Sequence, residues 1–249
     1  MKRCYSGNVL GAILLVAMST VYAAESCSTR SAVSVPTVIE LYTSEGCNSC
    51  PPADQWLSRL KSDPGIVALA FHVDYWDRLG WKDRFASPAF TQRQERESAR
   101  NGADYGYTPQ VVLDGVDNKR WYQESFPLSR HEVSKSVVDV KLTGDGNVFT
   151  ATITPTANAP AHLAAYWAVT EHNHQSAVKA GENAGATLKH DFVVREYQPI
   201  ATWNAKSGVA ETLQFTAKTR GDTAHPRQVN LVVTDAKSGR PVQAIKIGC

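Results

Sequence analysis

The chain has 249 residues, enough for one large domain or two of ordinary size. With 43% hydrophobic and 20% charged residues, its composition excludes both a disordered and a membrane-spanning chain. The formal net charge is only +2, so no electrostatic surface for nucleic acid or anionic lipid is expected.

Residues 1–23 are predicted to be a signal peptide. Lys2 and Arg3 precede an apolar run over residues 9–18, and small residues surround Ala23. This pattern is typical of secretion, and the run is shorter than the roughly 20 residues of a membrane span. An uncleaved anchor is the alternative. Cleavage would leave 24 basic residues against 24 acidic ones, because 26 − 2 = 24. We therefore expect a periplasmic or secreted protein without stable membrane insertion.

Four cysteines follow the predicted cleavage site: Cys27, Cys47, Cys50 and Cys249. An even number of cysteines in an exported protein favours disulfides. The simplest pairing joins Cys47 to Cys50 and makes Cys27–Cys249 a structural disulfide. Free thiols at the two chain ends are the alternative for the second pair.

Residues 24–135 are predicted to alternate between strands and helices. A β-branched strand over residues 35–42 leads into the two cysteines, and apolar residues at helical spacing follow until Asp63. A continuous apolar run over residues 66–73 predicts a buried parallel strand. Further elements are a charged, exposed helix over 88–100 with Ser87 as N-cap, a strand over 110–113 before an Asp114-Gly115 turn, and a helix within 124–136.

Residues 136–249 are predicted to form an all-β, sandwich-like domain. Short strands separated by Gly, Asn, Asp and Pro fill this half, and no helical stripe occurs. The predicted strands cover residues 137–142, 148–154, 163–170, 192–197, 212–217, 229–234 and 242–247.

The pair Cys47-x-x-Cys50 lies between a predicted strand and a predicted helix. A helix N-terminus lowers the pKa of a thiol, so we expect Cys47 to be the exposed attacking sulfur and Cys50 the resolving one. Pro51 and Pro52 remove two N–H donors, and the carboxylates of Glu45 and Asp54 oppose thiolate formation. The activation is therefore expected to be modest.

The sequence predicts no cofactor and no dedicated metal ligand set. A structural zinc site needs two more ligands, usually a second CxxC, and none is present. A copper site of Cys47, Cys50 and His72 is conceivable, although a histidine in an apolar strand is more often a hydrogen-bonded core residue.

The order strand, CxxC, helix, strand and Thr-Pro resembles a thioredoxin fold. The resemblance implies an α/β thioredoxin-like fold for residues 24–135, in which Thr108-Pro109 orients the substrate beside the dithiol. It also implies a buried acid before the motif. Glu40 occupies a similar position and is a candidate proton acceptor for Cys50, or else an acid at a strand edge.

The whole chain after residue 23 resembles an exported bacterial family known as domain of unknown function 1223. The hallmarks are ELYTSEGCNSCPPAD, AFHVDYWDRLGWKDRFASPAF, GYTPQVVLDG and KAGENAGATLKHDFVVR. The family implies a thioredoxin-like domain joined to a β-rich one and supplies no established reaction. In the second hallmark, four aromatic residues are expected either to line a substrate groove or to pack in the core and between the domains: Tyr75, Trp76, Trp81 and Phe85. In the fourth, His190 and Arg195 are expected to link the two domains.

Three hypotheses follow for the function. The first is a thiol–disulfide oxidoreductase that acts on protein thiols or disulfides and needs a redox partner. The second is a non-enzymatic periplasmic protein that binds copper or a peptide. In the third, the Cys47–Cys50 disulfide is a permanent clasp and the β-rich half binds a partner.

Overall fold

The structure is a computed structural model that describes residue 1 and residues 26–124 and 134–249. The predicted signal peptide beyond Met1, and most of the predicted helix within 124–136, lie outside these residues. The described strands are β1 (Ser26–Arg30), β2 (Thr37–Thr43), β3 (Ile66–His72), β4 (Gln110–Leu113), β5 (Val116–Asp117), β6 (Val138–Asp145), β7 (Val148–Pro155), β8 (His162–Glu171), β9 (His174–Ala177), β10 (Thr187–His190), β11 (Val193–Asn204), β12 (Glu211–Thr216), β13 (Arg227–Asp235) and β14 (Pro241–Ile247). The helices are α1 (Pro51–Ser58) and α2 (Pro88–Arg100), with single 3-10 turns at Asp77–Leu79 and Trp121–Gln123.

An eight-stranded sheet in the order β14-β13-β8-β11-β3-β2-β4-β5 runs through the molecule. β2 and β3 pair in parallel, and β4 pairs antiparallel with the other edge of β2. β11 joins the free edge of β3 in parallel, with Val193 opposite Ala70. β5 pairs antiparallel with β4 at one end of the sheet, and β8, β13 and β14 follow β11 in antiparallel order toward the other end. The sheet therefore combines strands from both halves of the chain.

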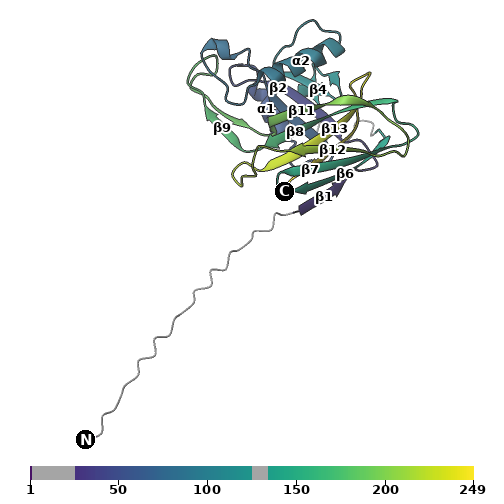
Figure 1. Cartoon of the computed structure of the whole chain (residues 1–249). Helices are drawn as coiled ribbons and strands as arrows, with labels where there is room; N and C mark the ends of the chain where they lie inside the picture. The colour runs from purple at the N-terminus through teal and green to yellow at the C-terminus, as the bar shows by residue number, and fades with distance from the viewer. Residues whose placement is uncertain (2–25, 125–133) are drawn as a thin grey trace.

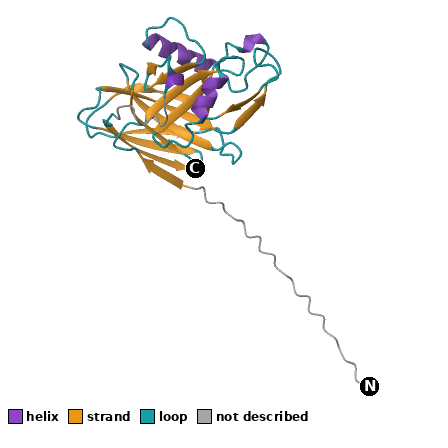
Figure 2. Cartoon of the chain, turned by 180° about the vertical axis from the view of Figure 1, so that it is seen from behind, coloured by secondary structure: helices purple, strands orange, loops and turns teal. Residues whose placement is uncertain are grey.

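Both faces of this sheet are covered. On one face, α1 packs over β2 and β3, and the four-stranded sheet β1-β6-β7-β12 packs over β8, β13 and β14. On the other face, α2 packs through Phe90 against β2 and β3. Figures 1 and 2 show the helices gathered at one end and the four-stranded sheet at the other. The hairpin of β9 and β10 projects beside α1.

The predicted fold class, an α/β thioredoxin-like fold plus a separate β sandwich, is wrong. The molecule is mostly β, with only two α-helices among the described residues, and its main sheet crosses the expected boundary at residue 136. The physical reason lies in β3, whose seven residues are all buried. Such a strand needs neighbours on both edges, and a sequence pattern shows burial without showing which strand lies alongside. The division of the chain into domains stays a prediction.

Several elements that were predicted from local sequence signals are present in the structure. The helix over 88–100 is confirmed, and Ser87 caps it by accepting a hydrogen bond from the Ala89 N–H at 3.3 Å. Asp114 and Gly115 have positive φ values of 48° and 79° at the turn between β4 and β5. The expected exposure of α2 is wrong for one face, since Arg93 and Glu97 are buried. No helix among the described residues is long and apolar enough to span a bilayer.

Candidate functional site

The dithiol motif lies in the connection between β2 and α1. β2 ends at Thr43 and α1 begins at Pro51. Cys47 and Cys50 form a disulfide with a Cα–Cα distance of 5.5 Å. Both cysteines are fully buried, so the prediction that Cys47 is exposed is wrong. Asn48 and Ser49 between them are exposed and form the outer surface of the motif.

Thr108 and Pro109 lie against this disulfide, although Thr108 is 61 positions from Cys47 in the chain. The peptide bond between Thr108 and Pro109 is cis. The Thr108 hydroxyl donates a hydrogen bond to the Cys47 Sγ at 3.3 Å, and Ser49 Oγ lies 3.4 Å from the same sulfur. The indole N–H of Trp76 donates to Thr108 Oγ1 at 2.8 Å, which orients the hydroxyl. The dithiol and the Thr-Pro pair therefore form one site.

The start of α1 offers few donors to the sulfurs. Pro51 and Pro52 have no N–H, and the N–H groups of Ala53 and Asp54 both donate to the Cys50 carbonyl, at 2.9 and 3.2 Å. The donors expected at a helix N-terminus are thus absent or already engaged. The Thr108 hydroxyl donates to the Cys47 Sγ instead, while Ser49 Oγ lies 3.4 Å from this sulfur and donates to the Thr108 carbonyl at 3.4 Å.

Replacing Thr108 with valine is expected to raise the pKa of the Cys47 thiol in reduced protein by about one unit. Valine keeps the side-chain shape but removes a hydrogen bond to the thiolate, and such charged bonds contribute about 1.5 kcal/mol or more. The pH dependence of Cys47 alkylation in a Cys50→Ala background measures the shift. Thr143→Val, a threonine on β6, is the control. An unchanged thiol pKa in Thr108→Val would contradict the assigned role of the hydroxyl.

A loop between β9 and β10 holds the backbone of the motif. The Asn183 side-chain amide donates to the carbonyls of Glu45 and Cys47 at 2.8 and 2.9 Å. The Glu182 carboxylate accepts the Asn48 N–H at 3.1 Å. Sequence reasoning missed both residues, although they lie in the fourth hallmark segment. Their contacts show that the second half of the chain contributes to the site.

Glu40 does not lie at the dithiol. It faces α2, whereas the motif and α1 lie on the opposite face of the sheet. Arg93 donates to both carboxylate oxygens, from Nε at 2.9 Å and from Nη2. The hydroxyls of Tyr42 and Tyr166 donate at 2.7 and 2.6 Å. No contact supports the expected role as proton acceptor for Cys50.

Buried acids and histidines lie beside the motif. His190, at the end of β10, turns Nε2 toward Glu45 Oε1 at 3.5 Å and Nδ1 toward Asp54 Oδ1 at 3.8 Å. Both distances exceed a good hydrogen bond, and neither ring nitrogen has a hydrogen-bond partner. Burial disfavours the imidazolium, but the two carboxylates outweigh burial and raise the pKa of His190 to about 10. His190 thus contacts residues of the N-terminal half, as its expected linking role requires.

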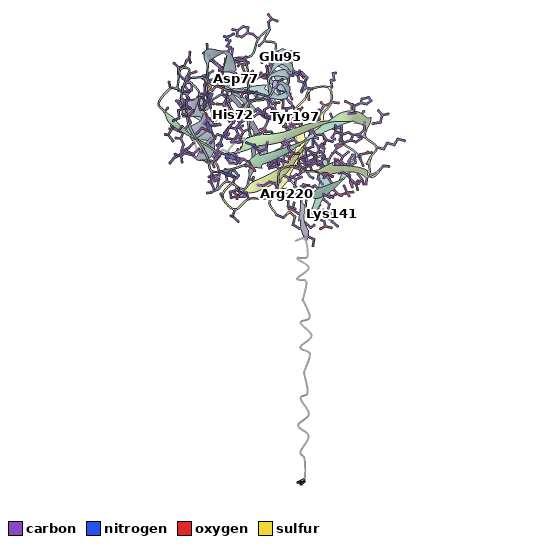
Figure 3. All side chains as sticks on the ribbon, turned by 60° about the vertical axis from the view of Figure 1, so that its left-hand side comes forward. His72, Asp77, Glu95, Lys141, Tyr197 and Arg220 are labelled. Carbon is purple, nitrogen blue, oxygen red and sulfur yellow. A yellow bond between two sulfur atoms is a disulfide. The ribbon has the colours of Figure 1, made fainter. Side chains whose placement is uncertain are left out.

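His72, at the end of β3, stacks edge-on against His190 with ring centroids 5.0 Å apart. Its Nδ1 lies 2.7 Å from Asp83 Oδ2, and its Nε2 has no hydrogen-bond partner. Burial raises the pKa of Asp83, but His72 and two backbone N–H groups lower it to about 2. Figure 3 shows His72 at the helical end of the molecule, near Asp77.

The aromatic segment after β3 packs onto this cluster. Trp81 donates its indole N–H to Glu45 Oε2 at 2.7 Å. Phe85 is buried, with its ring edge-on to His72 and His190 at centroid distances of 5.2 and 5.9 Å. Together with the bond from Trp76 to Thr108, these contacts favour packing over the alternative of a substrate groove.

The second disulfide joins Cys27 on β1 to Cys249, with a sequence separation of 222 and a Cα–Cα distance of 6.3 Å. Gly144 on β6 lies opposite Cys27, and a Cβ at that glycine would lie only 2.9 Å from the Cys27 Sγ. The disulfide therefore ties the edge of the four-stranded sheet to the residues that follow β14.

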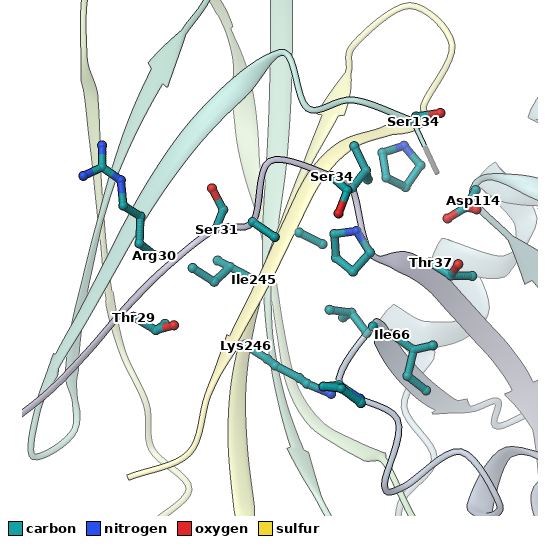
Figure 4. Close-up of a pocket in the computed structure, with 18 of the residues that line it drawn as sticks. Thr29, Arg30, Ser31, Ser34, Thr37, Ile66, Asp114, Ser134, Ile245 and Lys246 are labelled. Carbon is teal, nitrogen blue, oxygen red and sulfur yellow. The ribbon is translucent and has the colours of Figure 1, made fainter. Parts of the chain in front are cut away.

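A pocket of about 510 Å³ lies where β1, the segment before β2 and β14 meet (Figure 4). Arg30 and Lys246 are among its charged lining residues, and Ile66 contributes apolar surface. Its lining residues include no cysteine and no histidine. The pocket is therefore not part of the disulfide site.

The fold and site define a mostly β protein with a buried CxxC disulfide held between two distant chain segments. The chain belongs to the family described as "Protein of unknown function (DUF1223)", which it matches over residues 38–234. This match confirms the family resemblance expected from the hallmark segments.

Two solved structures are similar to this chain. Protein AGR_C_4864 from Agrobacterium tumefaciens is 28% identical, with a TM-score of 0.62, over 86% of this chain and 94% of that one. HBP35 of Porphyromonas gingivalis is 14% identical, with a TM-score of 0.59, over 87% of this chain and 76% of that one, and this likeness concerns the fold alone. No functionally curated protein matches the chain.

Proposed function

We propose that this protein is an exported thiol–disulfide oxidoreductase that reacts through Cys47 and Cys50. The observation that carries the proposal is the hydrogen bond of 3.3 Å from the Thr108 hydroxyl to the Cys47 Sγ. A purely structural disulfide needs no donor at one sulfur, whereas a thiolate at Cys47 is stabilised by one. Paired cysteines and the leader pattern of residues 1–23 support a periplasmic or secreted location.

The exchange takes place in two steps. The Cys47 thiolate of the reduced protein attacks one sulfur of a partner disulfide, the partner's S–S bond breaks, and its other sulfur leaves as a thiolate. The Cys50 thiolate then attacks the Cys47 Sγ, which restores the Cys47–Cys50 bond and releases the second partner thiolate. Two electrons pass from the protein to the partner disulfide. A second partner, itself a protein dithiol, returns them by the reverse steps.

Access to Cys47 requires a local movement, because the sulfur is fully buried. The Ser49 and Thr108 hydroxyls lie 3.4 and 3.3 Å from this sulfur, and the Trp76 indole binds the Thr108 hydroxyl. Ser49 is exposed, and Thr108 and Trp76 are half-buried. A partner segment that displaces the Ser49 and Thr108 side chains would therefore reach the sulfur without opening the core.

Trapping tests this proposal. The Cys50→Ala variant, incubated with a peptide dimer joined by one intermolecular disulfide, is expected to hold one peptide covalently on Cys47 and to release the other as a thiol, since no resolving thiol remains. Mass spectrometry measures the adduct, and a thiol reductant should release it. Cys47→Ala/Cys50→Ala is the control and should form no adduct. Absence of an adduct from Cys50→Ala, together with an ordinary Cys47 thiol pKa, would instead identify the disulfide as a structural clasp.

A further inference from the structure

Three buried side chains from three different elements converge beside the disulfide. Asp54 lies on α1, His72 ends β3 and His190 ends β10. They are 6%, 0% and 2% exposed. One possible metal-ligand atom from each residue lies within 4.8 Å of the other two.

Each of the three side chains has one polar atom that faces a neighbouring residue, which leaves its second polar atom available as a ligand. Asp54 Oδ2 accepts from the Thr43 hydroxyl at 3.0 Å, and His72 Nδ1 lies 2.7 Å from Asp83. His190 Nε2 faces Glu45 at 3.5 Å. The second nitrogens, His72 Nε2 and His190 Nδ1, are buried without hydrogen-bond partners.

This arrangement is the one that metal-binding histidines adopt. A histidine ligand holds the metal with one ring nitrogen and donates the N–H of the other to a carboxylate, which fixes its tautomer and orientation. Asp83 is in that position for His72, at 2.7 Å, and Glu45 is the carboxylate nearest to His190 Nε2, at 3.5 Å, from which a small ring shift would make the same bond. A buried imidazole nitrogen with no partner otherwise carries an uncompensated desolvation cost.

The local charge also favours a cation. Asp54, Asp83 and Glu45 place three buried carboxylates around two histidines. Buried charges are normally paired or bound to a metal. Without a metal, a proton on His190 balances part of this negative charge, and a divalent ion would replace that proton at Nδ1.

We propose that Asp54, His72 and His190 bind one divalent first-row transition-metal ion through Oδ1, Nε2 and Nδ1. Two imidazoles and a carboxylate suit ions such as Zn²⁺ or Fe²⁺ and do not suit Ca²⁺ or Mg²⁺, which prefer oxygen ligands. Donor atoms of a tetrahedral ion lie about 3.3 Å apart when the bonds are about 2.0 Å long. His190 Nδ1 and Asp54 Oδ1, now at 3.8 Å, need to approach only slightly.

The site differs from a copper centre on the cysteines, because both sulfurs are bonded to each other. It therefore binds metal while the disulfide is intact. The ion would join α1, β3 and β10, and Asp54 lies one helical turn beyond Cys50. Binding therefore needs no free thiol and can be measured separately from disulfide exchange.

The experiment uses the full chain with both disulfides closed, stripped of metal by a chelator. Equilibrium dialysis against Zn²⁺ is expected to give one ion per chain, and Co²⁺ is expected to give the visible absorption of a nitrogen–oxygen site without a sulfur-to-cobalt band. His72→Gln, His190→Gln and Asp54→Asn should each weaken Zn²⁺ binding about tenfold or more. His162→Gln, an exposed histidine outside the cluster, is the control and should bind like the parent protein.

Circular dichroism shows whether each variant folds. If a histidine variant does not fold, the rise in Tm that Zn²⁺ gives the parent protein, and its loss in the nearly isosteric Asp54→Asn, decide the question. The proposal is overturned if the parent chain binds no stoichiometric Zn²⁺, if binding persists in every folded ligand variant, or if His162→Gln abolishes it.

Discussion

Replacing Arg93 with methionine is expected to lower the free energy of unfolding by about 3–5 kcal/mol. Arg93 and Glu40 are both buried, and Arg93 binds both oxygens of the Glu40 carboxylate. Arg93 also donates to the Tyr197 hydroxyl at 2.9 Å, and its guanidinium lies over the Tyr166 ring at 4.1 Å. Methionine fills similar space but leaves the Glu40 charge buried without its cation. An uncompensated buried charge is strongly destabilising.

Urea unfolding of the two proteins measures this effect, with Arg30→Met as the matched control. Arg30 also forms a bidentate pair, with Asp139, but its side chain is 71% exposed. Exposed pairs contribute about 0–1 kcal/mol, so the control should change little. A comparable small loss in Arg93→Met would contradict the assigned role of the buried pair.

The same pair predicts a pH dependence. Burial tends to raise the pKa of Glu40, but Arg93 and the two tyrosine hydroxyls outweigh burial and lower it. A lowered folded-state pKa contributes stability that is present above the ordinary glutamate pKa and is lost as the pH falls. The difference in stability between the parent protein and Arg93→Met should therefore shrink in acid. A difference that stays constant with pH would show that lost packing, not charge, causes the effect.

Removing the Cys27–Cys249 disulfide by a double alanine substitution is expected to cost about 5 kcal/mol of unfolding free energy. In the chain-entropy model the stabilisation grows with the logarithm of the loop length, and this bridge spans a sequence separation of 222. The bridge also ties β1, at the edge of the small sheet, to the end of the large sheet. Without it, both chain ends gain freedom in the unfolded state.

The chain supplies its own control for this experiment. Cys47 and Cys50 are separated by only three positions, so the same model gives about 2 kcal/mol for Cys47→Ala/Cys50→Ala. Urea unfolding of the two double variants compares the bridges directly. Equal losses would show that strain or residual structure in the unfolded chain, and not loop length, determines the effect.

Much of the secondary structure was predictable because its signals are local. Ser87 and Pro88 mark the start of α2, and Asp114-Gly115 marks the turn between β4 and β5. The seven strands expected after residue 136 all exist, with shifted ends. β1, β9 and β10 were missed, since they are short and carry few β-branched or apolar residues. The error in fold class arose from strand neighbours, which no local pattern encodes.

The candidate site was likewise only partly predictable from the sequence. Cys47, Cys50 and Thr108-Pro109 carry recognisable chemistry, so the sequence was enough to select them as candidate site residues and to identify the family. Only the tertiary structure placed Glu40 on the opposite sheet face with Arg93. It also brought His190 from the distant β10 to Asp54 and His72. A residue's chemical type is local, whereas its partners depend on strand pairing and on which face of the sheet its side chain occupies.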